Sequence, residues 1–242
     1  SNDELVACFN SYVDQFNSEN EQAIEKGEVT ALSYSSSAFI EKASGIKNRY
    51  VMSKSDILNV DLMRPTFKER ANEELSLQAE IGVAAAKQAM AAANKSAEDI
   101  DLVIVACAYT QRSYPAMAIE IQQALGCGGW GFDMLVACSA ATFGIINAAN
   151  AIRSGTAKTV LVINPEILSP QVNYRDRDSH FIFGDVATAS IIEDESTATG
   201  EHVFKIIAEQ PITQFSNNIR SNIGYMNQCS PETEHADDKY FI

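Results

Sequence analysis

The middle of the chain alternates between short apolar segments and helical patterns, and this alternation constrains the fold more than any other feature. The predicted elements in order are a strand at 101–108, a helix at 115–125, a strand at 131–137, a helix at 139–153 and a strand at 158–164. Strands that alternate with helices pair in parallel, and the helices then cover the faces of the sheet. The sequence therefore predicts an α/β fold built on a mainly parallel sheet.

The segments on either side of this alternation predict further elements. Helices are expected at 2–16 and, in an alanine-rich stretch, at 72–94. Strand patterns without helices between them, which predict an antiparallel extension and hence a mixed sheet, occur at 181–183, 187–193 and 202–209. Residues 17–66 are interpreted as a loop-rich insertion, and the polar residues 213–242 as a long loop.

Cys138 stands at the bend between a predicted strand and a predicted helix. The small residues that follow it are compatible with a helix. Unpaired N–H groups at a helix N-terminus stabilise a thiolate, so the position favours a nucleophile. The alternative is a buried, inert thiol, because apolar neighbours disfavour the charged form.

Composition excludes several classes of function. The chain has 32 acidic and 18 basic residues and a formal charge of −14, which disfavours binding to nucleic acid or to anionic membranes. No apolar run approaches the ~20 residues of a membrane helix, and no signal pattern opens the chain. The five cysteines are widely spaced without a CxxC pair, and the three histidines lack metal-ligand spacing. We therefore expect a cytoplasmic protein without disulfides or a metal site.

Other motif-like features are interpreted as structural. The GxGxxG match at 126–131 follows a helix and precedes a strand, the reverse of the dinucleotide-binding order, and predicts a tight connection. Cys107 and Cys127 are expected to be buried, and Trp130 to be a packing anchor. His180 precedes a predicted strand, and a single histidine there is expected to be structural.

Five sequence blocks form a set whose order along the chain is informative. These blocks are Ser44-Gly45-Ile46-Lys47-Asn48-Arg49, the strand at 101–108, Tyr114-Pro115 with the helix ending at Gly126, Phe132-Asp133 before Ala137-Cys138-Ser139, and Asp176-Arg177-Asp178 with Phe183-Gly184-Asp185. In this order they are similar to the 3-oxoacyl-[acyl-carrier-protein] synthase III family (beta-ketoacyl synthase III), whose members have the layered thiolase-like fold.

The resemblance implies an acyltransferase of fatty acid biosynthesis. Cys138 would take an acyl group from an acyl-CoA, and a malonyl-acyl-carrier-protein would then condense with it in a decarboxylative Claisen reaction. Arg177 would hold the nucleotide end of coenzyme A, Phe39 would stack on adenine, and Tyr114 would reach the acyl pocket of the partner subunit in a homodimer. Coenzyme A and acyl-carrier-protein thioesters are substrates, and no further cofactor is implied. Surface placement of Arg177, a core position for Phe39 and ordinary packing of Tyr114 remain alternatives.

The departures from the family pattern concern completeness and substrate. The catalytic His and Asn of the family have no match before Ile242, and the family's first strand has no match before Ser1. The resemblance thus implies that 1–242 is the N-terminal thiolase-like domain of a longer enzyme, trimmed at both ends and inactive alone, with 213–242 leading into the missing half. Val186 and Thr188 replace family glycines, and Ala43 replaces a common arginine.

Two classes of function therefore stay open. The first is a condensing enzyme, either of the synthase III type or of a hydroxymethylglutaryl-CoA-synthase-like or head-to-head type. The second is a noncatalytic thiolase-like pairing subunit. The primer acyl group and the carrier of the donor thioester are not determined by these residues.

Overall fold

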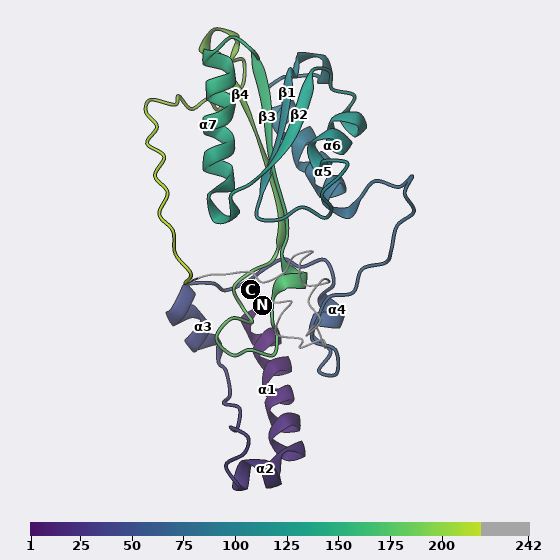
Figure 1. Cartoon of the computed structure of the whole chain (residues 1–242), viewed down its shortest axis with the longest axis vertical. Helices are drawn as coiled ribbons and strands as arrows, with labels where there is room; N and C mark the ends of the chain where they lie inside the picture. The colour runs from purple at the N-terminus through teal and green to yellow at the C-terminus, as the bar shows by residue number, and fades with distance from the viewer. Residues whose placement is uncertain (219–242) are drawn as a thin grey trace. The chain divides into compact units, whose positions relative to one another are not determined.

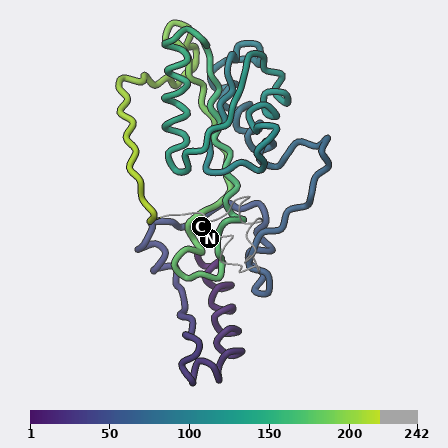
Figure 2. The backbone as a smooth tube through the Cα atoms, viewed as in Figure 1, coloured from purple at the N-terminus to yellow at the C-terminus, as the bar shows by residue number. Residues whose placement is uncertain are grey.

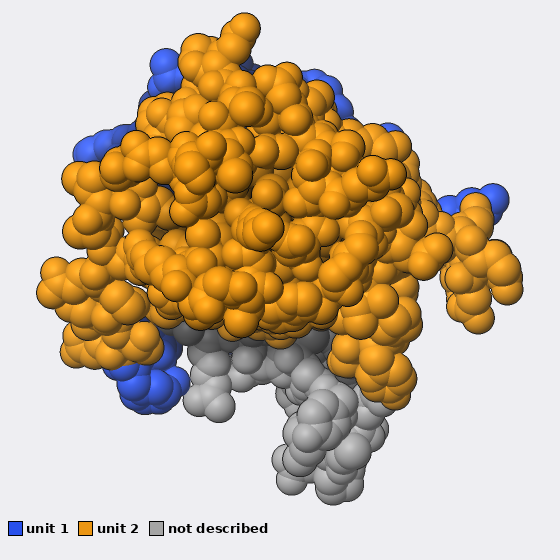
Figure 3. All heavy atoms as spheres, turned by 90° about the horizontal axis from the view of Figure 1, so that it is seen from above, with its two compact units in different colours: residues 1–68, 167–185, 215–242 blue, residues 69–166, 186–214 orange. Residues whose placement is uncertain are grey.

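The computed structural model describes residues 1–218, which divide into two compact units (Figure 3). Unit 1 comprises Ser1–Lys68, Ile167–Asp185 and, at the end of the described residues, 215–218. Unit 2 comprises Glu69–Glu166 and Val186–Gln214. Each unit therefore combines segments that are far apart in the sequence, and each is described here by itself.

Unit 2 is built on a four-stranded sheet with the order β2-β1-β3-β4. The strands are β1 (Leu102–Cys107), β2 (Trp130–Leu135), β3 (Thr159–Ile167) and β4 (Asp185–Glu193). β1 is buried throughout and pairs in parallel with both β2 and β3, with Leu102 opposite Trp130 on one side and Val160 on the other. The predicted alternation and the parallel pairing of its three strands are confirmed.

Helices cover both faces of this sheet (Figure 1). α5 (Leu77–Ala92) and α6 (Met117–Leu125) pack on one face, whereas α7 (Ala140–Arg153) packs on the other. Glycine makes the α7 contact close, because a Cβ at Gly144 would lie 2.8 Å from Val162 Cγ1. The connection between α6 and β2 is equally tight, since a Cβ at Gly129 would overlap the Asp101 carbonyl. The interpretation of 126–131 as a tight connection is confirmed.

Unit 1 is made of helices and turns. Its helices are α1 (Asn2–Glu19), α2 (Glu21–Glu25), α3 (Ser37–Ser44) and α4 (Lys54–Ile57). A capping box formed by Ser1 and Glu4 starts α1, and Phe9 on that helix packs in a core with Tyr174 and Phe181. The short helices α2 to α4 interrupt the segment 17–66, which the sequence presented only as loop-rich.

Two predicted strands are wrong. Residues 181–183 form part of a turn, in which buried Phe181 packs into the core of unit 1. Residues 202–209 form neither helix nor strand (Figure 2), and most of their apolar side chains are solvent-exposed, with Phe204 and Ile207 each 90% exposed. No strand among the described residues pairs with this segment, and a β-strand needs a neighbouring strand to satisfy its backbone hydrogen bonds. The predicted loop 213–242 lies outside the described residues from 219 onward.

No helix within residues 1–218 has the length and apolar character needed to cross a membrane.

Candidate active site

Cys138 lies in a single 3-10 turn, Ala137–Ser139, between β2 and α7. Its side chain is exposed, and α7 begins at Ala140. Ala137 has a φ of 45°, a left-handed conformation that costs a residue with a Cβ about 1 kcal/mol or more. The turn is closed by the Ser139 N–H, which donates to the Val136 carbonyl at 3.0 Å. The sequence placed the thiol at a strand-to-helix bend, and the structure shows that bend to be strained.

Two other cysteines of unit 2 differ from Cys138 in environment. Cys107 ends β1 and is fully buried, and this burial raises the pKa of its thiol to about 12. Cys127 is half-buried, and burial also raises the pKa of its thiol. Both therefore carry a proton at neutral pH. Among the cysteines of the described residues, Cys138 is the exposed one.

Asp133, in the middle of β2, holds the start of α6. Its two carboxylate oxygens accept hydrogen bonds from the N–H groups of Met117 and Ala118, each at 2.7 Å. These are orphan donors of the first helical turn, and a carboxylate is a favourable partner for them. In the sequence, Asp133 stood out only as part of the Phe132-Asp133 motif. A single carboxylate inside an apolar strand was the signal that could have revealed its role.

Gln78 on α5 braces the loop that follows β1. Its Nε2 donates to the carbonyls of Tyr109 and Pro165, both at 2.8 Å, and its Oε1 accepts from the Gln111 N–H at 2.6 Å. The side chain is 1% exposed, so nearly all of its polar atoms are removed from water and bonded internally. Gln78 was not identified from the sequence, because its partners are 31 to 87 residues away along the chain.

Tyr114 extends from the same loop. It precedes α6 through a cis bond to Pro115, and its side chain is 85% exposed. The loop follows the carboxyl end of β1, and the Cys138 turn follows the carboxyl end of β2, which is the parallel neighbour of β1. Both segments thus leave the sheet at the same edge, where ligands of open α/β sheets bind.

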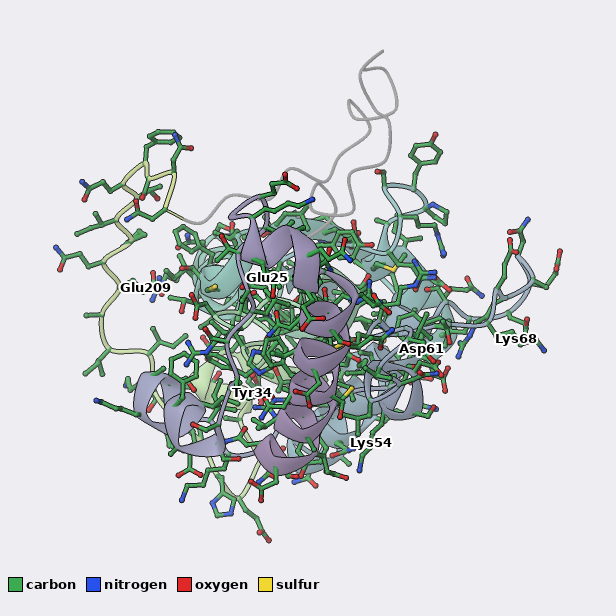
Figure 4. The ribbon with its side chains drawn as sticks, turned by 90° about the horizontal axis from the view of Figure 1, so that it is seen from below. Glu25, Tyr34, Lys54, Asp61, Lys68 and Glu209 are labelled. Atoms are coloured by element: carbon green, nitrogen blue, oxygen red, sulfur yellow. The ribbon has the colours of Figure 1, made fainter. Side chains whose placement is uncertain are left out.

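Arg177 and Phe39, both in unit 1, contact each other. The guanidinium carbon of Arg177 lies 4.0 Å from the centroid of the Phe39 ring, a cation–π contact. The Arg177 Nε donates to the carbonyl of Tyr34 at 2.8 Å, and Tyr34 lies in the irregular segment between α2 and α3 (Figure 4). Phe39 also packs edge-on against Phe181. The structure therefore brings the two predicted nucleotide contacts together.

The remaining candidates have structural surroundings. His180 is completely buried and stacks on Phe9, with ring centroids 4.7 Å apart, and burial lowers the pKa of its imidazole. Trp130 stacks on Phe132 but is 46% exposed. Within residues 1–218 no three His, Cys, Asp or Glu side chains form a group that could hold a metal ion.

Comparison with known proteins gives the family. A sequence profile described as 3-oxoacyl-[acyl-carrier-protein (ACP)] synthase III matches residues 132–209, which include the Cys138 turn. The beta-ketodecanoyl-[acyl-carrier-protein] synthase of Pseudomonas aeruginosa is 53% identical over 237 residues, covering 98% of this chain and 68% of that protein. The chain belongs to the beta-ketoacyl-[acyl-carrier-protein] synthase III family.

Other relatives of this synthase III chain agree. The beta-ketoacyl-[acyl-carrier-protein] synthase III of Bartonella henselae is 29% identical over 86% of the chain. Among solved structures, the priming beta-ketosynthase of the R1128 polyketide pathway is 28% identical over 66% of the chain, with a TM-score of 0.54. The chain spans 56% of the Bartonella protein and 42% of the R1128 chain. The thiolase-like α/β fold of the synthase III family is thus confirmed for this chain.

Proposed function

We propose that this chain supplies the nucleophile of a synthase III condensing enzyme, with Cys138 accepting the acyl group. The observation that carries the proposal is the exposed thiol on a strained turn directly before α7, whereas Cys107 is buried and Cys127 half-buried. A strained, exposed turn at a helix N-terminus is typical of nucleophile positions.

The first half-reaction follows from the surroundings of Cys138. The thiolate attacks the carbonyl carbon of an acyl thioester, a new S–C bond forms, and the carrier leaves as a thiolate that takes up a proton. The negative oxygen of the tetrahedral intermediate needs N–H donors, and the Cys138 N–H at the start of α7 is a candidate. This step leaves an acyl-cysteine.

The second half-reaction is a decarboxylative condensation. A malonyl thioester loses CO₂ as its C–C bond breaks, and the carbanion left behind attacks the acyl-cysteine carbonyl. The S–C bond to Cys138 then breaks, and its electron pair returns to the thiol. The products are CO₂, a 3-ketoacyl thioester and free Cys138.

Arg177 and Phe39 support a thioester carried by coenzyme A. A guanidinium stacked on an aromatic ring combines a cation for phosphates with flat surfaces for a purine. The contact between the two side chains leaves no room for a ring between them, so we propose that adenine stacks on an outer face of this pair or separates it. Ala43, where many family members have arginine, removes a further cation from this region.

The primer is proposed to be of medium length. The Pseudomonas relative is named for a beta-ketodecanoyl product. Because the condensation adds two carbons, a product of that length comes from an octanoyl primer. Identity of 53% over 98% of the chain supports a similar primer here.

The proposal is tested by intact-protein mass spectrometry after incubation with acetyl-, butyryl-, octanoyl- and dodecanoyl-CoA. We expect an octanoyl adduct that Cys138→Ala abolishes, with Cys127→Ala as a control that keeps it. Because the chain covers only part of its relatives, the measurement is made on this chain and on the intact enzyme that contains it.

The outcomes separate the remaining alternatives. An adduct on the intact enzyme but not on this chain would show that residues outside the chain complete the site. Absence of any adduct on both would contradict coenzyme A priming. Transfer from octanoyl-acyl-carrier-protein would then indicate a carrier-protein primer, and no transfer at all would favour a noncatalytic pairing subunit. Conversion with acetoacetyl-CoA and no malonyl donor would indicate the hydroxymethylglutaryl-CoA-synthase-like chemistry.

A further inference from the structure

A half-buried carboxyl group lies at the same edge of the sheet as the Cys138 turn and has no role in the half-reactions above. Glu166, near the end of β3, has a half-buried side chain whose Oε2 is inaccessible to solvent and lacks a hydrogen-bond partner among the described residues. Its Oε1 accepts the Ala108 N–H at 2.8 Å. Burial of a carboxyl oxygen without a hydrogen-bond partner costs folding free energy, so such a group is expected to have a role.

The peptide group that Glu166 binds is also the group that holds the nucleophile turn. The Ala108 N–H belongs to the peptide unit whose carbonyl is that of Cys107. This same carbonyl accepts the Val136 N–H at 3.3 Å, and the Val136 carbonyl in turn accepts the Ser139 N–H at 3.0 Å. Two hydrogen bonds therefore run in series through the Cys107–Ala108 peptide group, from the Val136 N–H to the Glu166 carboxyl group. The Ser139 N–H binds the Val136 carbonyl, which belongs to the next peptide group and is joined to this series through the Val136 backbone.

The strand register explains why these groups meet. Leu135 is opposite Cys107, and Ile163 is opposite Val105. Continuing both registers places Val136, Ala108 and Glu166 in one row across β2, β1 and β3. Neighbouring strands are about 4.8 Å apart, so the carboxyl group acts across two strand spacings through peptide groups and not by direct contact with the thiol.

We propose that Glu166 is a positioning residue for Cys138, which anchors the series of hydrogen bonds that holds the strained Ala137–Ser139 turn at the start of α7. A charged acceptor at the end of this series polarises the Cys107–Ala108 peptide group and strengthens its bond to the Val136 N–H. That bond fixes Val136, whose carbonyl closes the turn by accepting the Ser139 N–H. The left-handed Ala137 persists only while its surroundings fix it, and this series is what fixes it. The inference rests on the proposed role of Cys138 as the nucleophile.

The groups around Glu166 make its charge adjustable. Burial raises the pKa of Glu166 to about 7. The Cys107 thiol on β1 interacts electrostatically with Glu166 and is protonated at neutral pH. The charge of Asp133 on β2 also raises the pKa of this thiol. From α5, the neutral Gln78 amide contacts both the Cys107 sulfur and the carbonyl of Pro165. The carboxylate is the stronger acceptor, so the series is tighter above pH 7 than below it.

The test measures the turn without any substrate. Amide hydrogen exchange is followed at Val136 and Ser139, and the rate of Cys138 alkylation by iodoacetamide is followed by mass spectrometry from pH 5.5 to 9 in the intact enzyme. The variants are Glu166→Gln, which keeps an acceptor without the charge, and Glu166→Leu, which removes the acceptor. Glu193→Gln is the control, because Glu193 on β4 pairs with Lys95 and lies outside the series.

We expect Glu166→Leu to lose protection at Val136 and Ser139 and to slow alkylation about fivefold, as the thiolate loses its place at the helix N-terminus. Glu166→Gln should keep most of the protection and lose the pH step near 7 in the alkylation profile. Glu193→Gln should match the wild type in both. If Glu166→Leu does not fold, the pH profile of Glu166→Gln decides.

A Glu166→Gln profile that superimposes on the wild type, or unchanged exchange and alkylation in Glu166→Leu, would overturn the inference. Because iodoacetamide needs no acyl carrier, the result is independent of the acyl-transfer experiment. An enzyme that takes no acyl group yet shows the Glu166 effect would refute the proposed function alone.

Discussion

At the scale of single residues, the site depends on a few polar side chains that join elements distant in sequence. Asp133 is the clearest case, because one carboxylate on β2 binds two N–H groups at the start of α6. We expect Asp133→Ala to lower the free energy of unfolding by about 2 kcal/mol, the upper range for loss of a helix cap. Urea unfolding measures the change.

Two further variants make this expectation specific. Asp133→Asn keeps one acceptor and should cost about half as much. Asp178→Ala removes a carboxylate whose side chain is 79% exposed and should change stability by less than about 0.5 kcal/mol. Equal stability of Asp133→Ala and Asp178→Ala would show that Asp133 does not hold α6.

The local sequence predicted the bend that carries Cys138, but not the polar side chains that join neighbouring elements of the site. The bend around Cys138 is formed by adjacent residues, so strand and helix patterns located it. Gln78, Asp133 and Glu166 bind partners on other elements, at separations of 15 to 87 residues. A single sequence carries no signal of such pairs until the strand order and register are known.

At the scale of elements, the close packing of α7 on the sheet limits where the Cys138 turn can lie. A Cβ at Gly144 would approach Val162 Cγ1 to 2.8 Å and Ala106 Cβ to 3.1 Å. We expect Gly144→Ala to destabilise the protein by about 1–3 kcal/mol through overpacking, despite the better helix propensity of alanine. It should also change the alkylation rate of Cys138, since α7 begins two residues after it.

A second glycine provides the matched control for thermal unfolding. Nothing lies within 4 Å of a Cβ built on Gly128. Gly128→Ala should therefore leave the melting temperature nearly unchanged, and Gly144→Ala should lower it. Similar melting temperatures for both variants would mean that α7 can move away from the sheet at little cost.

The type of each element was predicted correctly where the apolar composition of a segment and the period of its apolar residues indicated the same element. The strands of the central alternation are mainly apolar, and each helix between them is followed within two residues by glycine. The apolar pattern at 202–209 predicted a strand wrongly. The period and composition of a segment indicate that it can form a strand, but a strand also needs a neighbouring strand to pair with. The bounds of α7 differed by only one residue, since the predicted helix at 139–153 begins at Ala140 in the structure.

At the scale of the whole molecule, Glu166 links stability to pH. Its pKa is raised from 4.5 to about 7, so the folded state binds its proton more tightly than the unfolded state. Stability should therefore fall as pH rises from about 4.5 to about 7, and the loss should be complete above that range. Glu166→Gln should remove this loss, so its melting temperature relative to the wild type should be higher at pH 8 than at pH 5.

Calorimetry at a series of pH values measures this difference. Other groups also titrate in the range, so the comparison is between wild type and Glu166→Gln at each pH. A difference in melting temperature that stays constant from pH 4.5 to pH 8 would contradict the linkage.

The composition of unit 1 has a consequence for biosynthesis. Its core combines α1 residues such as Phe9 with Tyr174 and Phe181, which are synthesised more than 150 residues later. At about 5–20 residues per second, the apolar face of α1 waits roughly 8–30 seconds on the ribosome for these partners. Unit 2 can gather β1, β2 and α6 during that interval, so the apolar face of α1 stays without its native partners while unit 2 begins to fold.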